Sequence, residues 1–195
     1  MPANDSSHGA QGHDEAAFAQ VFNSHADAVY GYCFRRSADW AAAEDLTSIV
    51  FMEAWRKRAS ADLAGANLLA WLLGIATNVL RNERRSRRRY RGALRRLPPL
   101  EPERDFADDA CERLEAQRRM RALLSQIRRL PRREQDVLFL WASGLRSADI
   151  SNVLGVAEGT VRTRLFRART RLGRLGLMRA ADLDVPVTSP KESVQ

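Results

Sequence analysis

The chain has 195 residues, of which 45% are hydrophobic and 29% are charged, enough for one or two compact domains with apolar cores. Its formal net charge of +8 favours a polyanionic partner. No apolar run approaches the roughly 20 residues of a membrane-spanning helix, and the polar start lacks a signal-peptide core, so we expect a soluble cytoplasmic protein. Cys33 and Cys111 are far apart, which argues against a zinc knuckle or a disulfide scaffold. We expect no metal and no cofactor.

The first part of the chain predicts helices. Residues 1–14 have the small, polar composition of a disordered tail. Apolar residues then recur at helical spacing from Glu15 to about Arg36, with a break expected near Ser24. Asp39 can cap a second helix, whose apolar residues are Leu46, Ile49, Val50, Met52 and Trp55.

A third helix changes character along its length. It begins with apolar residues between Leu68 and Val79 and becomes almost wholly basic after Leu80. Like charges at helical spacing repel by a few tenths of a kcal/mol per pair, and phosphates would relieve that repulsion. The alternative is a solvated helix end or a localisation-type cluster. We favour a DNA contact through Arg81, Arg84, Arg85, Arg88 and Arg89.

Prolines and acids between residues 93 and 110 indicate a flexible linker, which divides the chain into domains at 15–92 and 111–176. The second domain opens with a helix that carries Leu114, Leu124, Ile127 and Leu130 on one side. Pro131 suits the first position of the next helix, whose apolar residues are Val137, Leu138, Leu140 and Trp141. Residues 177–195 resemble a disordered tail. No strand pattern occurs, so the fold class is all-α, with two small helical domains.

Residues 144–170 predict a helix-turn-helix. Ser147 can cap the first helix and Gly155 ends it. In the second helix an apolar stripe, formed by Val161, Leu165, Ala168 and Leu172, leaves the opposite face to polar and aromatic residues.

That opposite face has the chemistry of a DNA reader. Arg can bond guanine bidentately, Thr can reach a base edge, and Phe can meet a thymine methyl. The predicted base contacts are Arg162, Thr163, Phe166 and Arg167, and the predicted phosphate contacts are Thr160, Arg164, Arg169 and Arg171. The alternative is an amphipathic helix with a solvated arginine face.

Three segments together carry a resemblance to a known family. They are AEDLTSIVFMEAWR, AWLLGIATNVLRNERRSRRR and LPRREQDVLFLWASGLRSADISNVLGVAEGTVRTRLFRARTRL, in the order seen in bacterial sigma factors. The chain resembles an extracytoplasmic-function, or group IV, member of the sigma-70 family, with sigma domains 2 and 4. The resemblance covers roughly residues 18–175. It implies a promoter-specificity subunit that joins core RNA polymerase, recognises minus-10 and minus-35 elements, helps to open the DNA, and is not an enzyme.

The resemblance also implies roles for particular residues. The clamp coiled coil of core polymerase would dock on Asp45, Leu46, Phe51 and Trp55, although Trp55 can instead be a core residue. The sequence departs from the family pattern at Ser48 and Ile49. Residues 59–66 match the segment that forms the pocket for a flipped base. The minus-10 contacts implied are Asn78, Arg81, Arg84, Arg85 and Arg88, whereas Trp71 is better explained as core than as a stacking wedge.

The partners implied are promoter DNA and core RNA polymerase, through its clamp coiled coil and its flap, with no small-molecule substrate. Family members are commonly held inactive by an anti-sigma factor, and the sequence does not identify one for this chain. One alternative is a helix-turn-helix regulator that acts without joining polymerase, but this leaves the acidic helix and the basic helix after it unexplained. A nuclease is disfavoured, because the sequence lacks a carboxylate cluster, a metal motif and a phosphate-binding glycine loop.

Overall fold

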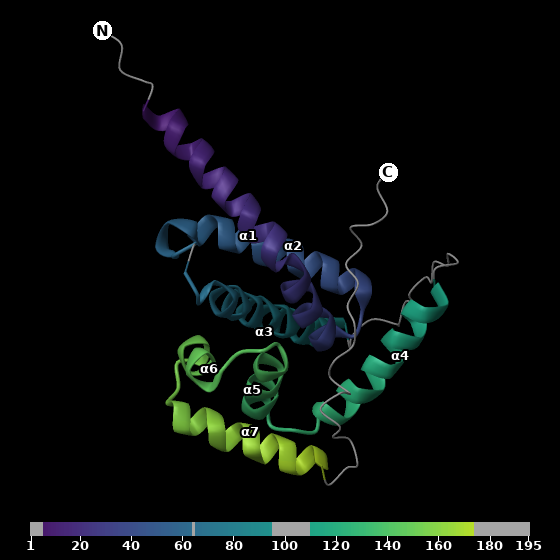
Figure 1. The fold of residues 1–195 in the computed structure, drawn as a ribbon. Helices are drawn as coiled ribbons and strands as arrows, with labels where there is room; N and C mark the ends of the chain where they lie inside the picture. The colour runs from purple at the N-terminus through teal and green to yellow at the C-terminus, as the bar shows by residue number, and fades with distance from the viewer. Residues whose placement is uncertain (1–5, 64, 95–109, 174–195) are drawn as a thin grey trace.

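The computed structural model describes residues 6–63, 65–94 and 110–173, and throughout these residues the secondary structure is helical (Figure 1). The all-α fold predicted from the sequence is confirmed. The first half contains α1 (Ser6–Ser37), α2 (Trp40–Lys57), a short 3-10 helix η1 (Arg58–Ser60) and α3 (Leu68–Leu94). The second half contains α4 (Ala110–Ile127), α5 (Arg132–Ala142), α6 (Ser147–Leu154) and α7 (Glu158–Gly173).

The core of the first half lies where α1, α2 and α3 meet. Val29, Val50 and Leu72, one from each helix, are fully buried there. The hydroxyl groups of Tyr32 and Thr77 are hydrogen-bonded to each other over 2.7 Å, so these two buried polar groups between α1 and α3 satisfy one another. Apolar burial therefore holds α3 against the other two helices through its first half.

The helix boundaries agree with the sequence in part. Asp39 caps α2 as expected, since its side chain accepts a hydrogen bond from the backbone N–H of Ala42 at 3.1 Å. By contrast, α1 begins at Ser6, inside the segment expected to be a tail, and continues through Ser24 without the expected break. Burial of the α1 face against α2 and α3 outweighs the weak helix preference of the polar residues near Ser24.

In the second half, α5 packs against α6 and α7 to form the helix-turn-helix core. Gly155 ends α6 in the left-handed conformation, with φ of 63°, as its position in the sequence predicts. The cap of α6 is Arg146 and not Ser147, because the Asp149 carboxylate accepts a hydrogen bond from the Arg146 N–H. Leu114 is exposed, so α4 packs through Met120, Leu124 and Ile127 instead.

The two halves are in contact. Helix α6 lies beside α3, and α5 lies beside α1 (Figure 1). Helix α4 also reaches α1, where the Arg121 guanidinium donates a hydrogen bond to the Ala38 carbonyl at 3.2 Å. Residues 95–109 of the expected linker and the expected C-terminal tail lie outside the described residues, whereas the linker's outer residues 93, 94 and 110 belong to α3 and α4. None of the described helices is long and apolar enough to cross a membrane.

Candidate DNA and polymerase interfaces

Helix α7 places its two predicted faces as the sequence pattern requires. Val161, Ala168 and Leu172 are buried against the rest of the second half. On the outer side Phe166 is 70% exposed, an unusual position for an aromatic side chain unless a partner covers it. Arg162, Thr163 and Arg167 are exposed on the same helix, so α7 presents these four residues together to solvent. We call these four residues the α7 reading face.

The reading face carries only local polar contacts that DNA could replace. Arg162 pairs with Glu158 one turn earlier, at 2.8 Å, and both side chains are largely exposed. The hydroxyl of Thr163 donates to the Gly159 carbonyl at 2.9 Å. Such exposed pairs contribute about 0–1 kcal/mol, so a guanine edge or a phosphate can displace them at little cost.

The predicted phosphate contacts on α7 differ in their surroundings. Arg171 donates from Nη1 to both carboxylate oxygens of the buried Glu134, at 2.6 and 2.7 Å. Arg169 lies over the Trp141 ring, with its Cζ 5.3 Å from the ring centroid. Thr160 and Arg164 are half-buried. Arg171 therefore has a structural partner that its place in the sequence did not reveal.

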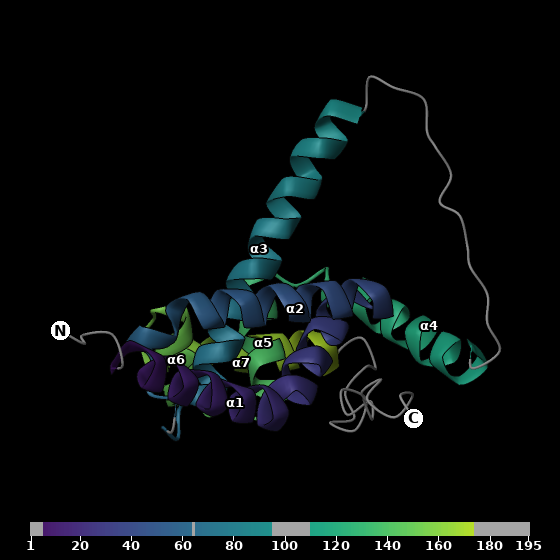
Figure 2. The ribbon, with the colours of Figure 1, turned by 90° about the horizontal axis from the view of Figure 1, so that it is seen from above.

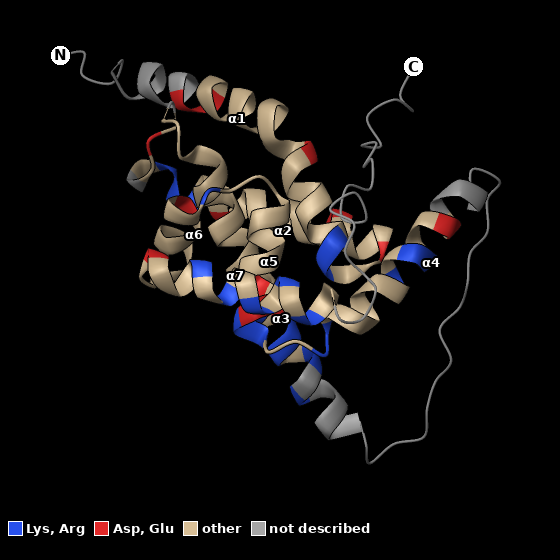
Figure 3. Cartoon of the chain, turned by 60° about the horizontal axis from the view of Figure 1, so that its bottom comes forward, with Lys and Arg blue, Asp and Glu red and all other residues tan. Residues whose placement is uncertain are grey.

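Helix α3 extends its basic half beyond the other helices (Figure 2). Viewed by charge, the described part of this half of α3 is rich in Lys and Arg (Figure 3). Asn78, Arg81 and Arg85 are exposed and Arg84 is half-buried, whereas the side chain of Arg88 lies outside the described residues. Burial lowers the pKa of Arg84, and the nearby Arg36, Arg132 and Arg128 lower it further. The positive charge at this end of α3 is thus dense enough to favour a polyanion.

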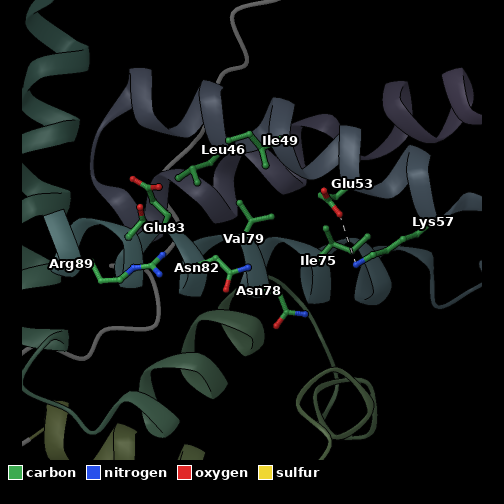
Figure 4. A pocket seen from close by; sticks show the side chains of 11 residues that line it. Leu46, Ile49, Glu53, Lys57, Ile75, Asn78, Val79, Asn82, Glu83 and Arg89 are labelled. Carbon is green, nitrogen blue, oxygen red and sulfur yellow. Dashed lines mark ion pairs between the residues drawn. The ribbon is translucent and has the colours of Figure 1, made fainter.

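A groove of about 430 Å³ runs between α2 and α3. Its floor is apolar, with Leu46, Ile75 and Val79, and its rim is polar (Figure 4). Asn78 and Asn82 of α3 and Ile49 of α2 all line this groove. The predicted docking helix and the predicted minus-10 helix therefore share one surface depression. In the described part of the chain, no group of three His, Cys, Asp or Glu residues is arranged to hold a metal ion.

The four predicted docking residues do not lie on one surface. Leu46 and Phe51 are buried, and Asp45 is exposed. The Phe51 ring is covered by Phe22, with ring centroids 4.7 Å apart. Trp55 is half-buried, with Phe18 of α1 against it at 5.1 Å. In this structure the rings of Phe51 and Trp55 pack against α1 and so help to hold α1 on α2.

Two residues of the apolar pattern of α2 lie outside the core. Ile49 is 40% exposed and Met52 is 60% exposed, although both belong to the apolar pattern of the helix. With the exposed Asp45 they follow the spacing i, i+4 and i+7, which places all three on one side of the helix. We call Asp45, Ile49 and Met52 the α2 outer face. This spacing could have identified the face from the sequence.

Comparison with known proteins identifies both halves of this arrangement. Residues 21–90 match the family described as Sigma-70 region 2, and residues 120–172 match Sigma-70, region 4. The chain belongs to the extracytoplasmic-function sigma-70 family. It is a sigma factor that directs transcription initiation, and it is not an enzyme.

Individual relatives agree with this assignment. The sigma factor is 34% identical over 170 residues to the ECF RNA polymerase sigma factor BldN of Streptomyces coelicolor, covering 85% of this chain and 62% of BldN. It is 28% identical over 179 residues to the ECF RNA polymerase sigma factor SigL of Mycobacterium tuberculosis, covering 88% of this chain and 97% of SigL. Its fold is similar to that of the sigma factor RpoE of Bartonella quintana, solved with the anti-sigma factor NepR, with a TM-score of 0.62 and 27% identity over 83% of this chain and 98% of RpoE.

The family assignment places the structural features in the sigma factor. Region 2 (residues 21–90) contains the α2 outer face and the basic half of α3, and region 4 (residues 120–172) contains the α7 reading face. Sequence reasoning missed Ser151, whose hydroxyl donates to the Val156 carbonyl at 2.6 Å and fixes the turn before α7. The conformation of the turn that sets the direction of α7 therefore depends in part on the Ser151 hydroxyl, a contact that the sequence pattern did not predict.

Proposed function

We propose that this sigma factor joins core RNA polymerase through region 2 and positions the holoenzyme on a minus-10 and a minus-35 element. The observation that carries the proposal is the pair of exposed surfaces, the α2 outer face and the α7 reading face, on two different regions of one chain. A regulator that binds only DNA has no use for the first surface. We further propose that it works in the cytoplasm.

The minus-35 element is assigned to the α7 reading face. Arg162 and Arg167 would bond guanine edges, and Phe166 would contact a thymine methyl in the major groove. Thr163 would reach a base edge or a phosphate. Thr160, Arg164 and Arg169 would fix the helix on the phosphate backbone. The domain proposed for this role spans residues 111–176, and the domain proposed for polymerase docking and minus-10 recognition spans residues 15–92.

The minus-10 element is assigned to α3. Opening the duplex costs a few kcal/mol for each unpaired base, which hydrogen bonds to an extruded base and cations along the freed strand can offset. Asn78, which lines the groove between α2 and α3, would supply the hydrogen bonds to the base. Arg81, Arg84, Arg85 and Arg88 would supply the charge, and the segment 59–66 before α3 would complete the base pocket.

Core polymerase is assigned to the α2 outer face, with the clamp coiled coil as its partner, while region 4 would contact the flap. Ile49 and Met52 supply apolar area at the centre of this face, and Asp45 and the half-buried Glu53 supply acidic groups at its edge. A basic, partly apolar coiled coil would complement that combination. An anti-sigma factor is a further partner that we propose for the same apolar patch, since RpoE was solved with NepR bound.

A reciprocal pair of variants tests the assignment. Met52→Glu should reduce the affinity for core polymerase and leave the binding of region 4 to minus-35 duplexes unchanged. Phe166→Ala should do the reverse, because its side chain lies on the other region. Both residues are exposed, so neither variant should alter the helical circular dichroism spectrum. Unchanged affinity of Met52→Glu for core polymerase would contradict the docking assignment, and fluorescence anisotropy with labelled core measures it directly.

A further inference from the structure

Asp136 lies at the contact between region 2 and region 4, and region 2 satisfies both of its carboxylate oxygens. Arg36 of α1 donates from Nη1 to Oδ1 at 2.8 Å. Arg81 of α3 donates from Nη2 to Oδ2, also at 2.8 Å. The Asp136 side chain is only 10% exposed. One carboxylate of region 4 is thus bound by two helices of region 2. We call the contact of Asp136 with Arg36 and Arg81 the Asp136 seam.

Further polar contacts between the two regions lie on either side of Asp136. The Arg36 side chain is 2% exposed, and its Cζ lies 4.9 Å from the centroid of the Phe139 ring of α5. Arg35 donates from Nη2 to the Ser143 hydroxyl at 2.9 Å. Beside these polar contacts, Gly74 of α3 faces Val153 of α6, and buried apolar residues of both regions belong to one cluster. Interfaces between the domains of one chain resemble transient protein contacts and can separate.

The electrostatics of the seam show that Asp136 offsets a local excess of positive charge. Burial by itself would raise the pKa of Asp136, but Arg36 and Arg81 outweigh it and hold that pKa below its ordinary value. On the other side, burial and the nearby Arg36, Arg132 and Arg128 lower the pKa of Arg84. Removing the Asp136 charge would therefore leave mutually repelling guanidinium groups, and the two regions would separate.

Arg81 connects the seam to DNA binding. A carboxylate and a phosphate present similar pairs of acceptor oxygens to a guanidinium group. While one Nη2 hydrogen of Arg81 is bonded to Asp136, a phosphate of the minus-10 strand cannot take that hydrogen, and only the remaining N–H groups of Arg81 can reach the strand. In addition, α6 lies against α3, so region 4 covers part of the helix that we assign to the minus-10 element.

We propose that Asp136 is an intramolecular lock, which holds region 4 on region 2 by occupying Arg81 and must be released before α3 can bind promoter DNA. The lock itself follows from the seam, whereas its effect on DNA rests on the function proposed above. In the free sigma factor the two regions are closed on each other. Promoter phosphates compete with Asp136 for Arg81 and favour the open arrangement.

A disulfide across the seam reports the closed state without polymerase or DNA. A Cβ atom at Gly74 of α3 would lie 3.6 Å from Cγ1 of Val153 of α6, so cysteines at these two positions are within the reach of a disulfide. Gly74→Cys/Val153→Cys is made in the full chain with Cys111→Ser, and Cys33 stays because it is buried. The rate of disulfide formation under mild oxidation then measures how much of the protein is closed.

At a salt concentration that leaves the wild type about half closed, Asp136→Asn should slow this disulfide about fivefold, because losing a charge-assisted hydrogen bond lowers the closed-to-open ratio about tenfold. Glu134→Gln is the matched control, since Glu134 is equally buried on α5 but pairs with Arg171 inside region 4. If Asp136→Asn fails to fold, Ser143→Ala removes the bond from Arg35 and should slow the disulfide to a smaller extent. Equal rates in wild type and in the seam variants that fold would overturn the lock.

The second arm tests competition with DNA. The oxidised, locked protein should bind a single-stranded minus-10 oligonucleotide at least about tenfold more weakly than the reduced protein, and reductant should restore binding. Equal binding by the two forms would overturn the competition. The two proposals can fail separately. If the disulfide rate depends on Asp136 but the protein never initiates transcription, the lock is supported and the proposed function is refuted. If transcription initiates normally but the disulfide rate does not change in Asp136→Asn, the proposed function is supported and the lock is refuted.

Discussion

Arg171→Ala is expected to destabilise region 4 rather than to weaken a phosphate contact. The guanidinium bonds both carboxylate oxygens of Glu134, whose side chain is 7% exposed, while Arg171 is 48% exposed. Removing one partner of a fully buried pair costs about 3–5 kcal/mol, and an exposed pair contributes about 0–1 kcal/mol. The half-exposed arginine lies between these limits. Glu134 lies in the first turn of α5, where the helix N-terminus stabilises an acid, and this reduces the destabilisation expected when Arg171 is removed.

We therefore expect a loss of about 2 kcal/mol in the free energy of unfolding of region 4. Urea denaturation of the full chain measures it, with the indole NMR signal of Trp141 as the probe, because Trp141 lies on α5 and the other tryptophans belong to region 2. Glu134→Gln and the double variant complete a thermodynamic cycle, in which the two single losses should not add.

Arg167→Ala is the matched control on the same helix. Its side chain is exposed on the α7 reading face, so stability should change by less than about 0.5 kcal/mol. Affinity for a minus-35 duplex should fall by about 1–3 kcal/mol, with relaxed preference at one base pair. The reasoning would be refuted if Arg171→Ala unfolds at the same urea concentration as wild type. A salt slope of DNA binding reduced by about one in that variant would assign Arg171 to a phosphate instead.

Three further predictions concern the fold. Gly155→Ala should cost about 1 kcal/mol of stability in thermal unfolding, because φ is 63° there; an unchanged melting temperature would contradict this. Tyr32→Phe should cost about 1 kcal/mol by removing the buried bond to Thr77, and a loss below experimental error would show that the bond contributes nothing. Burial raises the pKa of Cys33 to about 12, so the native thiol should stay protonated and resist alkylation from pH 7 to 9 in a Cys111→Ser chain. Rapid alkylation before unfolding would refute its burial.

Local chemistry made several elements predictable. The Asp39 cap and the Gly155 stop depend on residues within one turn, and both appear where the sequence places them. Val161, Ala168 and Leu172 are buried on α7. Their burial was predictable because the helical spacing of apolar residues identifies a buried side without knowledge of the other helices. Ile49 and Met52 belong to the apolar pattern predicted for α2, and that pattern did not separate these two exposed residues from the buried ones.

Long-range pairing was not predictable in the same way. Arg36 lies 100 residues before Asp136 in the chain and Arg81 lies 55 residues before it, and no local pattern links them. Phe51 is a similar case, because α1 supplies the rings that cover it. The early start of α1, at Ser6, was missed because composition alone describes residues 6–14 as polar.

Transcription reconstituted from purified parts tests the central claim most directly. Core bacterial RNA polymerase with this sigma factor is given fragmented genomic DNA, and transcript 5′ ends are mapped beside reactions with core alone. We predict new start sites that share a minus-35 and a minus-10 element, with the Arg167→Ala protein losing preference at the minus-35 element only. Active core and folded protein that yield no start sites beyond those of core alone would contradict the account.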